Sequence, residues 1–134
     1  MRFPGQLRGD GVYTALVDVE FRFPGDPRTY LALIDSGADL TIISAELLPP
    51  SIRYEDLGEA HEGKGAGCDF EFKTCQVEAW FQKWKFASFI GVIAPDTMPE
   101  PTALLGRLDF MRRFTVTFDW SKDPGMIDVR AIKR

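Results

Sequence analysis

The chain has 134 residues, of which 27% are charged and 45% hydrophobic, which is enough for one modest domain over residues 1–134 and too apolar for a disordered protein. Its formal net charge is −4 and it carries no basic run, which argues against nucleic acid and anionic membranes as partners. No segment approaches the roughly 18–20 apolar residues of a membrane span, and the first residues do not begin a signal peptide. We therefore expect an intracellular, cytoplasmic protein.

The first part of the chain is predicted to form a β-hairpin. Residues 12–23 are rich in β-branched and aromatic residues and alternate in polarity. The Pro-Gly-Asp-Pro sequence at 24–27 is a strong turn signal, and residues 29–34 are apolar again. This hairpin would deliver Asp35 at the end of its second strand, whereas residues 1–10 are expected to be flexible.

Short elements are predicted beyond Asp35. Residues 40–43 form an apolar run of strand length, and residues 44–48 are typical of a helical turn that Ser44 caps and two prolines end. Residues 61–67 are the most glycine-dense part of the chain.

The rest of the chain indicates further strands. Apolar residues alternate over 68–72 and, in the opposite phase, over 75–81, which predicts a bulge near residues 73–74. An apolar strand is expected at residues 86–94, followed by a loop at 95–101 and a short apolar run at 103–106. A short helix over residues 107–113 and a closing hairpin of residues 114–118 and 126–132 come last. Many short strands with little helix are typical of an all-β protein, either a small closed barrel or a sandwich.

The cysteines and the histidine do not indicate a metal site. If Cys68 and Cys75 share one extended strand they lie roughly 23 Å apart, which is too far for a disulfide. A zinc site built on two thiolates would need further ligands, and His61 is the only histidine. We expect neither a metal nor a cofactor.

The stretch LALIDSGADLTIIS is an apolar run that breaks on acidic residues and then resumes. A bare Asp-Ser-Gly most often forms an Asx turn at a strand end. Here apolar residues stand on both sides, so we expect a loop pinned between buried strands. A carboxylate that emerges from a core is costly unless it is hydrogen-bonded or used in chemistry. Asp35 is therefore a candidate catalytic residue.

Three segments of the chain, a loop, a glycine-rich segment and an apolar-apolar-Gly segment in that order along the sequence, resemble the retropepsin-like aspartic proteases. This family includes the retroviral proteases and their single-domain cellular and bacterial relatives. Residues 34–39 resemble the active-site loop of that family, and residues 103–107 resemble its apolar-apolar-Gly segment. The strand beneath the loop would consist of Leu104, Leu105 and Gly106. The family places its flap where this chain has Gly63, Lys64, Gly65, Ala66 and Gly67. The resemblance implies a small closed all-β barrel of the retropepsin type with one short C-terminal helix.

The resemblance also implies roles for the loop residues. Ser36 would brace two paired loops by hydrogen bonds, Gly37 would let the backbone approach the substrate, and Ala38 would keep the cleft floor small. Asp39 would form a partly buried salt bridge with Arg107, whose planar guanidinium suits a carboxylate.

Two of these assignments have plain alternatives. Asp39 and Arg107 could both be solvated surface charges. The glycine-rich segment could be an ordinary solvent turn, and Lys64 is a charged residue for a flap tip over an apolar substrate.

The mechanism of aspartic proteases, as a class, needs two carboxylates that share one proton around a water molecule. The chain holds one Asp-Ser-Gly, and the nearest second candidate, Asp96-Thr97-Met98, has methionine in place of glycine. The resemblance therefore implies a homodimeric endopeptidase in which each subunit contributes Asp35. Its substrate would be an extended peptide with apolar side chains beside the scissile bond.

Two other functions stay open at this point. One is a catalytically silent retropepsin-like module that binds peptides or dimerises. The other is an unrelated β-barrel binding domain in which the Asp-Ser-Gly-Ala is only a turn. In addition, viral members of the family interleave short chain termini in a dimer sheet. This chain instead continues past the expected short helix with a hairpin of its own, so the dimer geometry is open as well.

Overall fold

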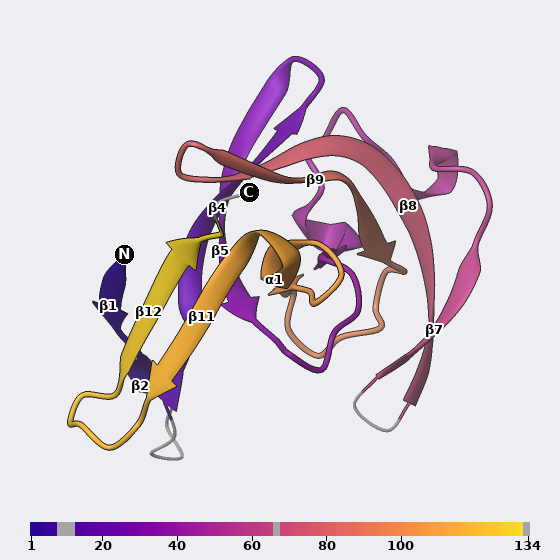
Figure 1. Cartoon of the computed structure of the whole chain (residues 1–134). Helices are drawn as coiled ribbons and strands as arrows, with labels where there is room; N and C mark the ends of the chain where they lie inside the picture. Colours follow the sequence, from indigo (N-terminus) through magenta and orange to yellow (C-terminus); the bar gives the residue numbers. More distant parts are fainter. Residues whose placement is uncertain (8–12, 66–67, 133–134) are drawn as a thin grey trace.

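The computed structural model describes residues 1–7, 13–65 and 68–132, which fold almost entirely into strands (Figure 1). The strands are β1 (Arg2–Pro4), β2 (Gln6–Leu7), β3 (Tyr13–Thr14), β4 (Leu16–Phe23), β5 (Asp26–Ile34), β6 (Ile42–Ser44), β7 (His61–Gly65), β8 (Cys68–Phe81), β9 (Trp84–Ile93), β10 (Ala103–Leu105), β11 (Phe114–Asp119) and β12 (Met126–Ala131). The helical elements are the 3₁₀ turns η1 (Ala45–Leu47) and η2 (Tyr54–Asp56) and the α-helix α1 (Phe110–Arg113). Within these residues, no helix is long and apolar enough to cross a membrane.

Six strands close into a barrel. They follow one another in the order β4, β5, β10, β6, β9 and β8, and β8 pairs back onto β4 at residues 78–80. The other half of β8 leaves the barrel and pairs with β7. Figure 1 shows β8 as a long curved ribbon that carries the β7/β8 hairpin away from the barrel. The predicted all-β fold, a closed barrel with one short helix, is confirmed.

Strand β4 shows how alternation builds the barrel wall. Its odd-numbered residues from Val17 to Phe23 are buried, whereas Asp18 and Arg22 are exposed. Each fully buried side chain of this size stabilises the fold by about 1.5–3 kcal/mol. The predicted hairpin of β4 and β5 is present, with Pro24 and Gly25 at its turn.

A cluster of aromatic rings attaches α1 to the barrel. The ring of Phe110 lies 5.1 Å from that of Phe86 and 4.7 Å from that of Phe114, and Phe81 meets Phe114 at 5.2 Å. Most of these contacts are edge-to-face, which is a favourable geometry for aromatic pairs. The cluster fixes both the short helix and the start of β11.

The two ends of the chain form a separate three-stranded sheet in the order β1-β12-β11, which lies to the left of the barrel in Figure 1. Strand β1 pairs with β12 and places Arg2 opposite Asp128. Residues 2–4 and 6–7 are paired with β12 and β3, and the flexibility expected of residues 1–10 stays a prediction. Residues 8–10 lie outside the described part of the chain.

Two local predictions are wrong. Strand β8 keeps a regular register with β9 from Phe72 to Gln76, and the irregularity falls between Gln76 and Trp80 instead of near residues 73–74. The two apolar sets of β8 occupy opposite faces, because one half of the strand pairs with β4 in the barrel and the other half pairs with β7 in the hairpin. Ser44 precedes η1 but does not cap it, since its Oγ accepts a hydrogen bond from the Thr102 amide at 2.9 Å.

Candidate active site

Asp35 follows the last residue of β5, at the point where the parallel strand β10 ends beside it. Ile34 lies opposite Leu105, and the Asp35 amide donates to the Leu105 carbonyl at 3.1 Å. The Asp35 Oδ1 accepts the Gly37 amide at 2.8 Å, and the Ala38 amide donates to the Asp35 carbonyl at 3.1 Å. The loop is thus an Asx turn that holds a partly exposed carboxylate at its start.

The segment after β10 supports this loop from the other side. The Arg107 amide donates to the Ala38 carbonyl at 2.9 Å. Gly106 permits the close approach, because a Cβ at that position would lie 2.4 Å from the carbonyl carbon of Leu40 and 2.6 Å from the Asp39 carbonyl oxygen. The loop and this segment therefore touch backbone to backbone, and the position of Asp35 depends on that contact.

The predicted contact between Asp39 and Arg107 is present, with the Arg107 Nη2 donating to the Asp39 Oδ1. The two side chains are 66% and 56% exposed, so the pair is not partly buried as expected. An exposed pair of this kind contributes about 0.2–1 kcal/mol. The ion pair is therefore a minor brace beside the backbone contacts.

A half-buried acid beside the loop was not anticipated from the sequence. Asp109 accepts hydrogen bonds from the Thr41 amide at 2.9 Å, from the Thr41 hydroxyl at 2.7 Å and from the Phe110 amide at 2.6 Å. Burial raises the pKa of the Asp109 carboxyl above its ordinary value, although the hydrogen bonds from Thr41 and Phe110 oppose this shift. The short helix was expected over residues 107–113 but begins at Phe110, so Asp109 stands at its N-cap position instead of inside it.

An apolar row lies beside the loop on the outer face of the barrel. The row consists of Leu33, Ile42 and Leu104. Each of these residues stands next in sequence to a buried core residue, so its own side chain points outward. Leu104 lies opposite both Leu33 and Ile42, and all three are only partly buried. Next to Ile42 the row continues over Gly91, where a Cβ would lie 2.8 Å from the Ile42 Cγ2. Leu104, predicted only as loop support, therefore also faces a surface that can take an apolar ligand group.

Strands β7 and β8 form a hairpin at the predicted flap. His61 lies opposite Phe72, and Gly63 lies opposite Phe70, whose ring would be 2.7 Å from a Cβ at Gly63. The phenylalanine ring therefore covers the glycine. The tip of the predicted flap, Ala66 and Gly67, lies outside the described residues.

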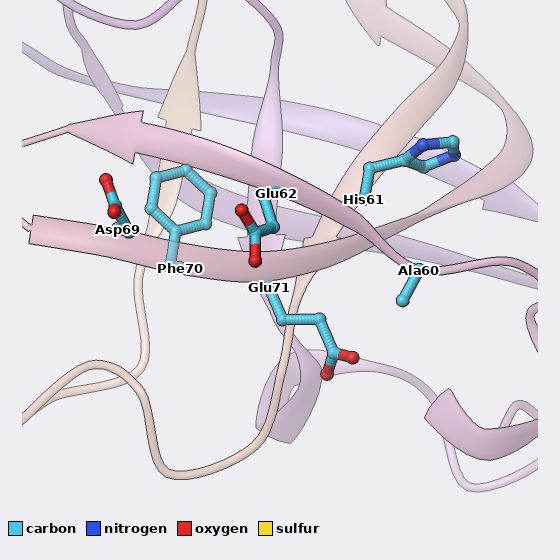
Figure 2. A pocket seen from close by; sticks show the side chains of 6 residues that line it. All are labelled: Ala60, His61, Glu62, Asp69, Phe70 and Glu71. Carbon is cyan, nitrogen blue, oxygen red and sulfur yellow. The ribbon is translucent and has the colours of Figure 1, made fainter.

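A hollow runs along this hairpin and is lined by Ala60, His61, Glu62, Asp69, Phe70 and Glu71 (Figure 2). In Figure 2 the Glu71 side chain points to the side opposite Phe70. The Tyr54 hydroxyl of η2 lies 3.0 Å from the Glu71 carboxylate, and the Lys73 Nζ donates to the Tyr54 carbonyl at 3.3 Å. Burial, followed by the bond to Glu71, raises the pKa of Tyr54 to about 12. Tyr54 thus anchors the base of the hairpin, and Asp35 does not line this hollow.

Candidate metal ligands do not gather in the described part of the chain, where no three His, Cys, Asp or Glu side chains form a cluster. Cys75 is a free, buried thiol on β8.

Comparison with known proteins identifies a family for this chain. A family model described as retroviral aspartyl protease matches residues 10–119, a span that includes the Asp35 loop, the β7/β8 hairpin and the segment after β10. No curated protein matches the chain.

Proposed function

This chain belongs to the retroviral aspartyl protease family, and on that basis we propose that it is an aspartic endopeptidase that works as a homodimer. A water molecule would lie between two Asp35 carboxylates, one from each subunit. The ionised carboxylate takes a proton from the water, and the protonated one gives a proton to the carbonyl oxygen of the scissile peptide. Carboxylates so close cannot both ionise, so the pair shares one proton and titrates as a unit.

The observation that carries this proposal is the way Asp35 is held. Its carboxylate is partly exposed at a strand end, and one oxygen accepts the Gly37 amide at 2.8 Å. Leu105 and Arg107 hold the loop on both sides through backbone hydrogen bonds. Such an arrangement fixes the direction of an acid without removing it from solvent, which a carboxylate needs to meet both water and substrate.

The dimer follows from the number of such acids. The chain contains one Asp-Ser-Gly and no second Asp-Ser/Thr-Gly. A second copy is therefore the source of the second carboxylate, and a two-fold axis brings two identical loops together. Ser36 is exposed on the loop and would brace it against its copy, with the half-buried Ala38 behind it.

The substrate class follows from the surface beside Asp35. Leu33, Leu104 and Ile42 offer apolar contacts to side chains next to the scissile bond. An extended peptide would lie between this row and the β7/β8 hairpin, which closes over it as a flap. Alternate side chains of the peptide would then enter the apolar row.

The test is cleavage of a diverse peptide mixture from mildly acidic to neutral pH. The parent should cut peptides, Asp35→Asn should cut none, and the matched control Asp96→Asn should cut as the parent does. Asp96 is exposed and begins the nearest second candidate motif, so the control also shows that it is not the second acid. Binding of peptides by the parent and by Asp35→Asn, with cleavage by neither, would contradict the proposal and indicate a silent binding module.

A further inference from the structure

The loop from Asp35 to Thr41 is attached to one segment, residues 105–109, at both of its ends. At the near end the Asp35 amide donates to the Leu105 carbonyl at 3.1 Å. At the far end the Thr41 amide donates to the Asp109 carboxylate at 2.9 Å. Between these ends the Arg107 and Leu108 amides donate to the Ala38 and Asp39 carbonyls at 2.9 and 2.8 Å, although Ser36, Gly37 and Asp39 are exposed.

Thr41 connects Asp109 to the rest of the segment. Its side chain is fully buried, at 0% exposure. The hydroxyl donates to Asp109 Oδ1 at 2.7 Å and accepts the Gly106 amide at 3.3 Å. A hydroxyl can donate one hydrogen bond and accept another through the same oxygen atom. The carboxylate, the hydroxyl and the Gly106 amide therefore form one connected network behind the loop.

We propose that Asp109 is a positioning residue for Asp35, which it holds in place by fixing Thr41 at the far end of the loop. The consequence for catalysis rests on the proposed function. Release of one end would let the carboxylate shift relative to its counterpart on the second subunit. A misplacement of about 1 Å at a reacting group can cost roughly 10²-fold in rate.

Asp109 has a second task that a test must separate from the first. It caps α1 by accepting the Phe110 amide. Asp109→Ser keeps a good N-cap residue but shortens the side chain, so it no longer reaches Thr41. Asp109→Ala removes both contacts. Thr41→Ser keeps the amide and the hydroxyl and is the conservative control.

The experiment measures amide hydrogen exchange by NMR and steady-state kinetics on the parent, Asp109→Ser, Asp109→Ala and Thr41→Ser. In Asp109→Ser we expect exchange at the Thr41 amide to rise about tenfold or more, with β4 amides unchanged. We expect kcat to fall about 10- to 100-fold while KM stays within about twofold. Thr41→Ser should match the parent in both readouts, and Asp109→Ala should show at least the losses of Asp109→Ser.

Parent-like exchange at Thr41 in folded Asp109→Ser would overturn the positioning role. A parent-like kcat in that variant would do the same. If the parent cuts no peptide, the proposed function fails, whereas hydrogen exchange still decides whether Asp109 holds the loop.

Discussion

At the scale of single residues, the Asp35 loop depends on a close backbone approach more than on charge. Gly106 lets the segment after β10 lie against the backbone of Asp39 and Leu40, whereas the ion pair of Asp39 with Arg107 is largely exposed. Backbone atoms in a packed contact cannot move aside as a side chain can. The glycine therefore constrains the loop more than the ion pair does.

We expect Gly106→Ala to lower the free energy of unfolding by about 3 kcal/mol, because overpacking against a rigid neighbour is costly. Urea unfolding measures the loss. Gly91→Ala is the matched comparison, since its Cβ would meet a side-chain methyl group of Ile42 at 2.8 Å instead of backbone atoms. A loss at Gly106 equal to or smaller than that at Gly91 would contradict this account of the loop.

Sequence reasoning identified Asp35, the loop and Gly106 because each belongs to a short motif. It did not find Asp109, whose partner Thr41 is 68 positions away in the chain. A hydrogen bond of that kind depends on how strands from distant segments pair, and local patterning does not carry that information. The contact of Asp39 with Arg107 spans the same number of residues and was predicted only because the family resemblance implied it, and its exposure was not predicted.

At the scale of elements, the β7/β8 hairpin is anchored by η2 through Tyr54. The folded protein raises the pKa of Tyr54 to about 12 from an ordinary value of 10. The folded state therefore holds the hydroxyl proton more tightly than the unfolded state does. The contribution of Tyr54 to the free energy of unfolding is complete below pH 10 and is lost as the pH rises through 12.

Tyr54→Phe should accordingly flatten the decline in stability over this alkaline range. Unfolding by urea at a series of pH values, for the parent and the variant, measures the slope. Tyr30, whose pKa burial also raises, accounts for part of the slope that remains. A variant that keeps the whole slope of the parent would show that the hydroxyl of Tyr54 does not cause it.

The aromatic cluster gives α1 its stability, since a helix of four residues has little of its own. Phe110 is completely buried among the rings of Phe81, Phe86 and Phe114. Phe110→Ala should cost about 3–5 kcal/mol in thermal or urea unfolding.

The control for Phe110→Ala is Phe118→Ala, because the Phe118 side chain is 43% exposed on β11. Its loss should be clearly smaller than that at Phe110. Equal losses at the two positions would mean that the cluster is not what holds the helix.

Strand β8 shows which features of an element its own sequence can predict. Its existence and its two apolar sets were clear from alternation. The set at 68–72 and the set at 75–81 indicated a bulge because a strand is usually apolar on one face. The structure has apolar side chains on both faces of β8, since one half joins the barrel and the other half the hairpin. Only the arrangement of the neighbouring strands could reveal this.

At the scale of the whole molecule, the many short strands left a closed barrel and a sandwich open, and the family resemblance implied the closed barrel that the structure shows. Closure comes from the pairing of β8 with β4, in which Ala79 lies opposite Phe21. The terminal sheet joins Arg2 to Asp128 across almost the whole chain. Contacts between such distant segments leave no local signature, so the pairing of β1 with the predicted C-terminal hairpin became clear only in the structure.

The central claim is that one chain holds half of an active site. It is tested most directly by mixing the parent with Asp35→Asn, allowing subunits to exchange, and measuring peptide cleavage at constant total protein. Two complete carboxylates then occur only in dimers of two parent chains. An equal mixture should retain about one quarter of the activity of the pure parent, as random pairing of two kinds of subunit requires. Retention of about one half would mean that each chain carries a complete site, and would contradict the shared pair of Asp35 residues.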